Sequence, residues 1–211
     1  MEDIEDLDDI FPHHFAERYF PCRHGQIEFV LFQSRLAALA WLRSSVSRSI
    51  DDEILRLEQE KEEPHNEPSG LEGEVNLALT ESIYMLDSDT RGITSGAIIA
   101  AAVAALEALV HQLLTSSEIK KLHHKGFNQK LRTLEVRWKN RIDSNRLHER
   151  VEWLRSRRNS FAHRLLDESM FAYWTEDRIR EFELSDEEVE QALLYVGEVA
   201  EMLEDAAAQD H

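Results

Sequence analysis

Three side chains within one short stretch are of types that could bind phosphate or transfer protons near it. In "RSRRNSFAHR", residues 155–164, Arg158 is followed directly by Asn159, and His163 comes five positions after the arginine. A histidine exchanges protons near neutral pH, and an arginine binds phosphate oxygens through a fork of N–H donors. The three residues are therefore candidates for a site that handles phosphate.

Further cations surround these three residues. Arg155, Arg157 and Arg164 lie in the same stretch and are candidates for contacts to a nucleic-acid backbone. Residues 118–164 hold 14 lysines and arginines against 5 aspartates and glutamates, although the whole chain has a formal net charge of -18. An acidic protein repels nucleic acid at long range, so the sequence predicts local, salt-sensitive contact with phosphates.

The position of Arg158 on its expected helix is unusual. In the helix that we expect over residues 144–165, an apolar seam recurs at helical spacing, at Leu147, Val151, Leu154, Phe161 and Leu165. Arg158 occupies the seam position between Leu154 and Phe161. An arginine there is costly unless it is paired or reaches a polar cavity; alternatively, its stem packs on the seam and its guanidinium extends into water.

Arg158 and His163 do not share a face in an ideal helix. At roughly 100° per residue, the two side chains point about 140° apart, whereas Asn159 and His163 lie on one face. One phosphate reaches both only if the helix ends or distorts there, if the arginine wraps round, or if a second subunit completes the site.

Helical periodicity extends over most of the chain, and no stretch has the alternation of a β-strand. Thr94 or Ser95 is the expected N-cap of an alanine-rich helix, and Ser185 with Glu188 forms a capping box. We expect chain breaks at an acidic Pro/Gly loop over residues 60–74 and at "DSDTRG", residues 87–92. The expected helices cover residues 26–61, 74–86, 94–114, 128–139, 144–165 and 185–208.

These elements predict an all-α protein in two parts. Residues 1–73 comprise an acidic arm with aromatic anchors, a long helix and the acidic loop, and residues 74–211 form a helical bundle. The segment around Phe171, Tyr173 and Trp174 is open to three interpretations: a short strand pair, a loop, or a cap over the core.

The composition argues against a disulfide-bonded, a secreted and a membrane-spanning protein. The single cysteine, Cys22, excludes an internal disulfide framework and suits a reducing compartment. The acidic N-terminus is unlike a secretory signal, and the longest apolar run, residues 97–106, is shorter than the roughly 20 residues of a membrane span. We therefore expect a cytoplasmic protein without a membrane segment. No ligand spacing predicts a metal or a cofactor.

The motif and its neighbour resemble a known family. "RRNSFAHR" is similar to the R-x4-H signature of the HEPN superfamily, with Arg158, Asn159 and His163 at the signature positions. "AAAVAALEALVHQLL" looks like the family's helix that carries an acidic residue, here Glu107. The resemblance covers roughly residues 95–205, and it implies an all-α bundle that forms a homodimer and joins two motifs in one cleft.

The resemblance also implies an activity. Many HEPN proteins are metal-independent endoribonucleases of prokaryotic toxin–antitoxin or antiphage defence systems, which implies RNA as substrate and an antitoxin or a defence complex as partner. The substrate's 2′-hydroxyl would attack the phosphorus and leave a cyclic phosphate. In this scheme Arg158, Asn159 and His163 are catalytic, Arg155, Arg157 and Arg164 bind RNA, and Glu107 supports an active-site arginine or the histidine.

Two other functions stay open. One is a non-catalytic helical interaction or regulatory subunit, since not every protein of this family cuts RNA. The other is a nucleotide-binding regulator that uses the same pocket, which thermal stabilisation by nucleotides without RNA cleavage would reveal.

Overall fold

The computed structural model describes residues 16–62, 72–166 and 184–210, and the side chains of residue 72 and residues 163–166 lie outside this description. Within the described ranges every regular element is a helix, so the all-α prediction is confirmed. Residues 63–71 of the predicted loop at 60–74, the segment 167–183 and residues 1–15 of the predicted arm at 1–23 lie outside the described residues, and residues 60–62 and 72–74 are helical. The elements are α2 (Ile27–Glu62), α3 (Glu72–Tyr84), η2 (Met85–Thr90), α4 (Arg91–Gln112), α5 (Ser116–Lys121), α6 (Phe127–Arg137), α7 (Ser144–Leu166) and α9 (Asp186–Ala208).

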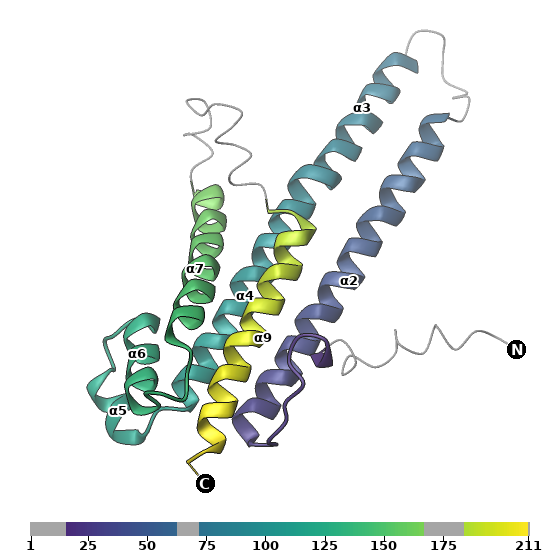
Figure 1. The fold of residues 1–211 in the computed structure, drawn as a ribbon. Coiled ribbons are helices and arrows are strands. Elements are labelled where there is room, and N and C mark those ends of the chain that lie inside the picture. The colour runs from purple at the N-terminus through teal and green to yellow at the C-terminus, as the bar shows by residue number, and fades with distance from the viewer. Residues whose placement is uncertain (1–15, 63–71, 167–183, 211) are drawn as a thin grey trace, which may run out of the picture.

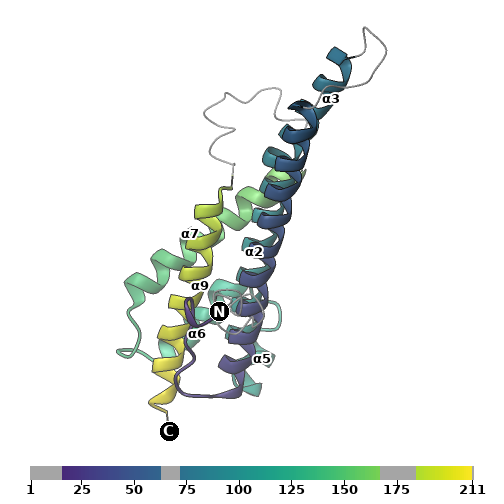
Figure 2. The ribbon, with the colours of Figure 1, turned by 90° about the vertical axis from the view of Figure 1, so that its right-hand side faces the viewer.

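The core forms where α4 packs against α2, α7 and α9 (Figures 1 and 2). Ile99, Ala102, Leu106 and Leu109, which recur at helical spacing along α4, are buried. Phe29, Phe32 and Leu36 of α2 are buried in the same core. The far half of α2 and α3 extends beyond the bundle as a long pair of antiparallel helices (Figure 1).

The predicted break at residues 87–92 is wrong. Helix α3 continues through the π-helical turn η2 directly into α4, so Thr94 and Ser95 lie inside a helix and are not N-caps. Arg91 gives the physical reason: its guanidinium lies 2.6 Å from Asp51 of α2 and 3.2 Å from Asp87. These pairs hold the polar segment against α2, and the hydroxyl of Thr94 donates to the carbonyl of Thr90 one turn earlier.

The resulting helix, Gly73–Gln112, contains a window that is long and apolar enough to cross a membrane, with a mean hydropathy of 2.0. In this protein 56% of that window is buried. The core helix of a soluble protein passes the same test of length and composition, so this single helix is weak evidence for a membrane.

The N-terminal segment before α2 is fastened to α9. Glu204, which is only 1% exposed, accepts hydrogen bonds from the backbone N–H groups of Arg23 (3.1 Å) and His24 (2.9 Å). Gly197 allows the backbone of Tyr19 to approach, because a Cβ atom at this position would lie 1.8 Å from the carbonyl oxygen of Tyr19. The predicted capping box of Ser185 and Glu188 opens α9.

Candidate functional site

Arg158 joins α7 to α4 at the surface of the bundle. Its Nη1 donates to Oε1 of Glu107 over 2.6 Å, and the two side chains are 47% and 35% exposed. The seam residues Leu147, Val151 and Leu154 are buried, whereas Arg158 leaves the seam and reaches this carboxylate. This ion pair gives the guanidinium a charged hydrogen-bond partner. Helix α4, which carries Glu107, thus supplies the polar group that an arginine at a seam position needs.

A glycine of α4, Gly96, allows α7 to approach α4 closely at Phe161. A Cβ atom on Gly96 would lie 1.9 Å from Cδ2 of Phe161, so the ring occupies the space that a larger residue would fill. Phe161 packs against the core one turn after Arg158. The direction of the end of α7, which carries the rest of the motif, therefore depends on Gly96.

Arg158 and Glu107 line a cavity of about 550 Å³ between α4, α6 and α7, with Arg155 and Asn159. The start of α6 supplies Asn128 to the same cavity, together with Phe127 and Gln129. Arg155 also pairs with Glu152 one turn earlier at 2.8 Å. The structure thus brings four of the predicted residues together: Arg155, Arg158, Asn159 and Glu107.

The structure does not bring Arg157 to this cavity. Its guanidinium lies 3.0 Å from Glu188 of α9 and 5.5 Å from the ring centroid of Trp153. Predicted as an RNA contact, Arg157 instead fastens α7 to α9.

Two more arginines share that side of α7. Arg146 (3.0 Å) and Arg150 (2.9 Å) both pair with Glu198 of α9. Burial raises the pKa of the Glu198 carboxyl, but the hydrogen bonds from Arg150 and Arg146 outweigh it, so this pKa is lowered overall. The arginines of α7 therefore divide between a structural face towards α9 and a face that lines the cavity.

His163 and Arg164 lie in the last turns of α7. Their side chains are outside the described part of the chain, so the expected angle of about 140° between Arg158 and His163 stays a prediction.

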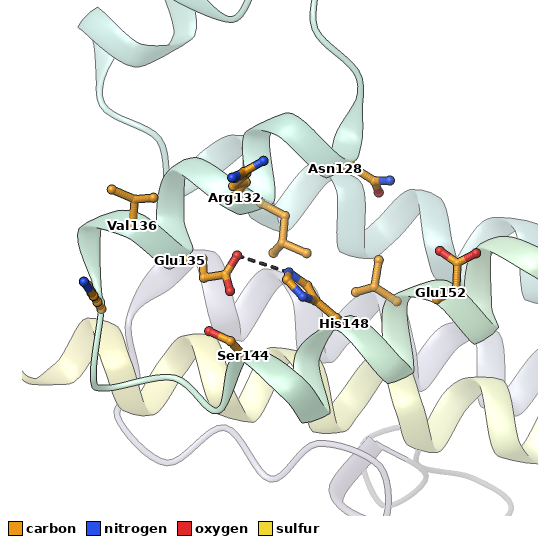
Figure 3. A pocket seen from close by; sticks show the side chains of 10 residues that line it. Asn128, Arg132, Glu135, Val136, Ser144, His148 and Glu152 are labelled. Carbon is orange, nitrogen blue, oxygen red and sulfur yellow. Dashed lines mark hydrogen bonds and ion pairs between the residues drawn. The ribbon is translucent and has the colours of Figure 1, made fainter.

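A second cavity, of about 870 Å³, lies between α6 and α7 (Figure 3). Its charged lining residues are Arg132, Glu135, Lys139, His148 and Glu152. Nε2 of His148 lies 3.1 Å from Oε2 of Glu135. Asn128 and Val151 line both cavities, so the two adjoin. We call the two cavities together the α6–α7 groove.

Our reading of the sequence missed the residues of this second cavity. The signal was present as two matched helical stripes, at residues 128, 132 and 135 of α6 and at residues 144, 148, 152 and 155 of α7. Only the packing of the two helices shows that these stripes face each other. Among the described residues, no three His, Cys, Asp or Glu side chains gather in a group that could hold a metal ion.

Comparison with protein-family models gives no match to this chain, and neither do comparisons with curated proteins and with solved structures.

Proposed function

We propose that the protein is a metal-independent endoribonuclease of the HEPN type, which acts in growth arrest or antiphage defence. The observation that supports this proposal best is the pair of Arg158 with Glu107 on the wall of a cavity that Asn159 also lines. The pair joins the R-x4-H stretch to the acidic residue of the alanine-rich helix, the two segments on which the resemblance rests. His163 follows Arg158 in the same helix.

The geometry of Arg158 leaves it able to bind a phosphate. A guanidinium has five N–H donors, and Glu107 accepts from Nη1 alone. The remaining donors form a fork that fits two phosphate oxygens, and the side chain is 47% exposed. Glu107 therefore orients the arginine without occupying it, and Arg158 would stabilise negative charge that develops on the phosphoryl oxygens.

The reaction itself needs one base and one acid. The 2′-hydroxyl of the RNA gives its proton to a base and attacks the phosphorus, the bond from phosphorus to the 5′-oxygen breaks, and the leaving oxygen takes a proton from an acid. The products are a 2′,3′-cyclic phosphate and a 5′-hydroxyl end. A neutral imidazole serves as the base and an imidazolium as the acid, so His163 from each of two subunits would supply both roles in a homodimer.

The test is cleavage of end-labelled RNA in excess EDTA, with the product ends examined for the cyclic phosphate. Arg158→Ala and His163→Ala should each lower the rate of cleavage by roughly 100-fold or more. Arg35→Ala is the matched control, because Arg35 is an exposed arginine of α2, a helix that supplies no residue to either cavity. A rate of cleavage in both motif variants equal to that of the native protein would refute the assignment.

A second function has its own support in the structure. Several large apolar side chains of α2 are exposed, among them Ile27, Leu31, Trp41 and Leu42. Such a surface suits a helical interaction subunit. An interaction subunit should lose its effect on growth arrest or defence in cells when Trp41→Glu is introduced, and should keep it with Arg158→Ala. A ribonuclease should lose that effect with Arg158→Ala.

A further inference from the structure

We propose that the α6–α7 groove binds the phosphate backbone of single-stranded RNA and leads the strand to Arg158. This inference rests on the proposed function, because it assigns a substrate path to the same site. It adds two binding residues, Arg132 and Lys139, that neither the motif nor the resemblance indicates.

The two cavities form a path along α7. The larger one begins at Ser144 and the smaller one ends at Asn159, and they adjoin at Asn128 and Val151. Ser144 and Asn159 are 15 positions apart, which corresponds to about 22 Å along the helix axis at about 1.5 Å per residue. Several nucleotides therefore fit along the groove, with one end at the pair of Arg158 and Glu107.

The charges within the groove favour an anion. Each of its three carboxylates has a partner: Glu107 pairs with Arg158, Glu135 with His148, and Glu152 with Arg155. Arg132 and Lys139 line the larger cavity, and neither makes an ion pair or a side-chain hydrogen bond within the described part of the chain. The groove thus presents two available cations and no free carboxylate, although the whole chain is strongly acidic.

The pair of His148 and Glu135 lies in the larger cavity (Figure 3). The Glu135 side chain is only 15% exposed, and its carboxylate is 3.1 Å from the imidazole. Arg132 and Lys139 from the α6 side, and Glu152 from α7, are the other charged groups of this cavity. His148 is the hydrogen-bond partner of Glu135 and is charged only when it is protonated, so the groove's preference for an anion rests on Arg132 and Lys139.

Ser144 also lines this cavity, but it does not form a nucleophile with His148. The described residues show no hydrogen bond between the two side chains, and the Nε2 atom of His148 faces Glu135. We therefore assign binding and not a second chemical step to this part of the groove.

Single-stranded RNA fits the remaining lining better than a duplex does. Asn128, Gln129 and Asn159 present amides that can hydrogen-bond to base edges, and Phe127 is a partly buried aromatic ring at the same cavity. Amides and aromatic rings reach bases that are splayed out of a stack, whereas a duplex keeps its bases paired and is recognised mainly by shape.

The experiment measures binding without cleavage. A fluorescent single-stranded RNA with 2′-O-methyl groups cannot be cut by the proposed reaction, because its nucleophile is blocked. Its affinity for the native protein, Arg132→Gln, Lys139→Gln and the double variant is measured over a range of salt concentrations. We expect about tenfold weaker binding for each lost charge-assisted contact. The slope of log K against log salt should fall by about 0.7 for each lost phosphate contact.

Lys121→Gln is the matched control. Lys121 is an exposed lysine of α5, has no ion pair within the described residues and does not line the groove. An unchanged affinity in the double variant would overturn the proposal, and so would equally tight binding of a duplex or no binding of this RNA to the native protein. Failure of the proposed function has a different outcome. The native protein would then leave unmodified RNA uncut, while the double variant would still bind the 2′-O-methyl RNA more weakly than the native protein does.

Discussion

Nη1 of Arg158 and Oε1 of Glu107 lie 2.6 Å apart, and this contact connects the R-x4-H segment of α7 to the C-terminal part of α4. Because both side chains are partly exposed, the pair should contribute at most about 1 kcal/mol to the free energy of unfolding. The contact therefore bears on the orientation of the arginine more than on the stability of the fold.

This ion pair predicts different effects on RNA cleavage for substitutions of Arg158 and of Glu107. Arg158→Ala should lower kcat for RNA cleavage by roughly 100-fold or more, because it removes charge stabilisation of the transition state. Glu107→Gln should lower kcat less and leave KM nearly unchanged, since the arginine remains but is oriented less firmly. Glu58→Gln, at an exposed carboxylate of α2, is the control. Loss of the folded state in Arg158→Ala, measured by thermal unfolding, would contradict the small stability contribution expected for the pair.

Gly96→Ala should reduce both stability and activity. The new Cβ atom would lie 1.9 Å from the ring of Phe161, so the end of α7 must shift, at a cost of roughly 1–3 kcal/mol. Denaturant unfolding measures the loss, and RNA cleavage measures the effect on the motif. Phe161→Leu should partly rescue Gly96→Ala, because the smaller side chain leaves room for the methyl group. Strictly additive effects of the two substitutions would show that the contact does not matter.

Gly197→Ala should destabilise the attachment of the N-terminal segment. Its Cβ atom would lie 1.8 Å from the carbonyl oxygen of Tyr19, which is backbone and cannot rotate away. We expect a loss of roughly 1–3 kcal/mol in the free energy of unfolding, together with faster amide exchange in residues 19–24. Gly73→Ala is the control: it has open space around it and lies in a helix, so it should gain up to about 1 kcal/mol. Equal effects of the two substitutions would argue against the close approach.

Tyr19 should make stability fall at high pH. Burial, together with its hydrogen bond to Glu190, raises the pKa of Tyr19 from 10.0 to about 12. The folded protein then holds the phenolic proton more tightly than the unfolded chain. The resulting stability is fully present below pH 10 and is lost as the pH rises to about 12.

Chemical unfolding of the native protein and of Tyr19→Phe between these pH values tests this expectation. The free energy of unfolding should fall more steeply with pH in the native protein, because Tyr19→Phe has no proton to lose at this position. Parallel curves would mean that Tyr19 is not responsible.

Helix positions could be read from the sequence where local signals are strong. The range 26–61 was expected and α2 covers Ile27–Glu62, and the capping box at Ser185 lies where it was expected. The similar box of Thr115 with Glu118, which opens the short helix α5, was present in the sequence and was overlooked. Residues 87–92 have the composition of a turn, yet they remain helical because Arg91 pairs with Asp51, 40 positions earlier.

In the candidate site, too, some features follow from the local sequence and others depend on tertiary contacts. The sequence by itself determined that a helix carries Arg158, Asn159 and His163, and that Arg158 interrupts an apolar seam, because both follow from spacing along one helix. Only the tertiary structure decided which arginines are available. Arg157 turns to Glu188 of α9, Arg158 to Glu107 of α4, and Arg132 to an open groove with no partner among the described residues. The physical reason is that the partner of a surface charge is set by the packing of distant helices, and the periodicity of a single helix contains no information about it.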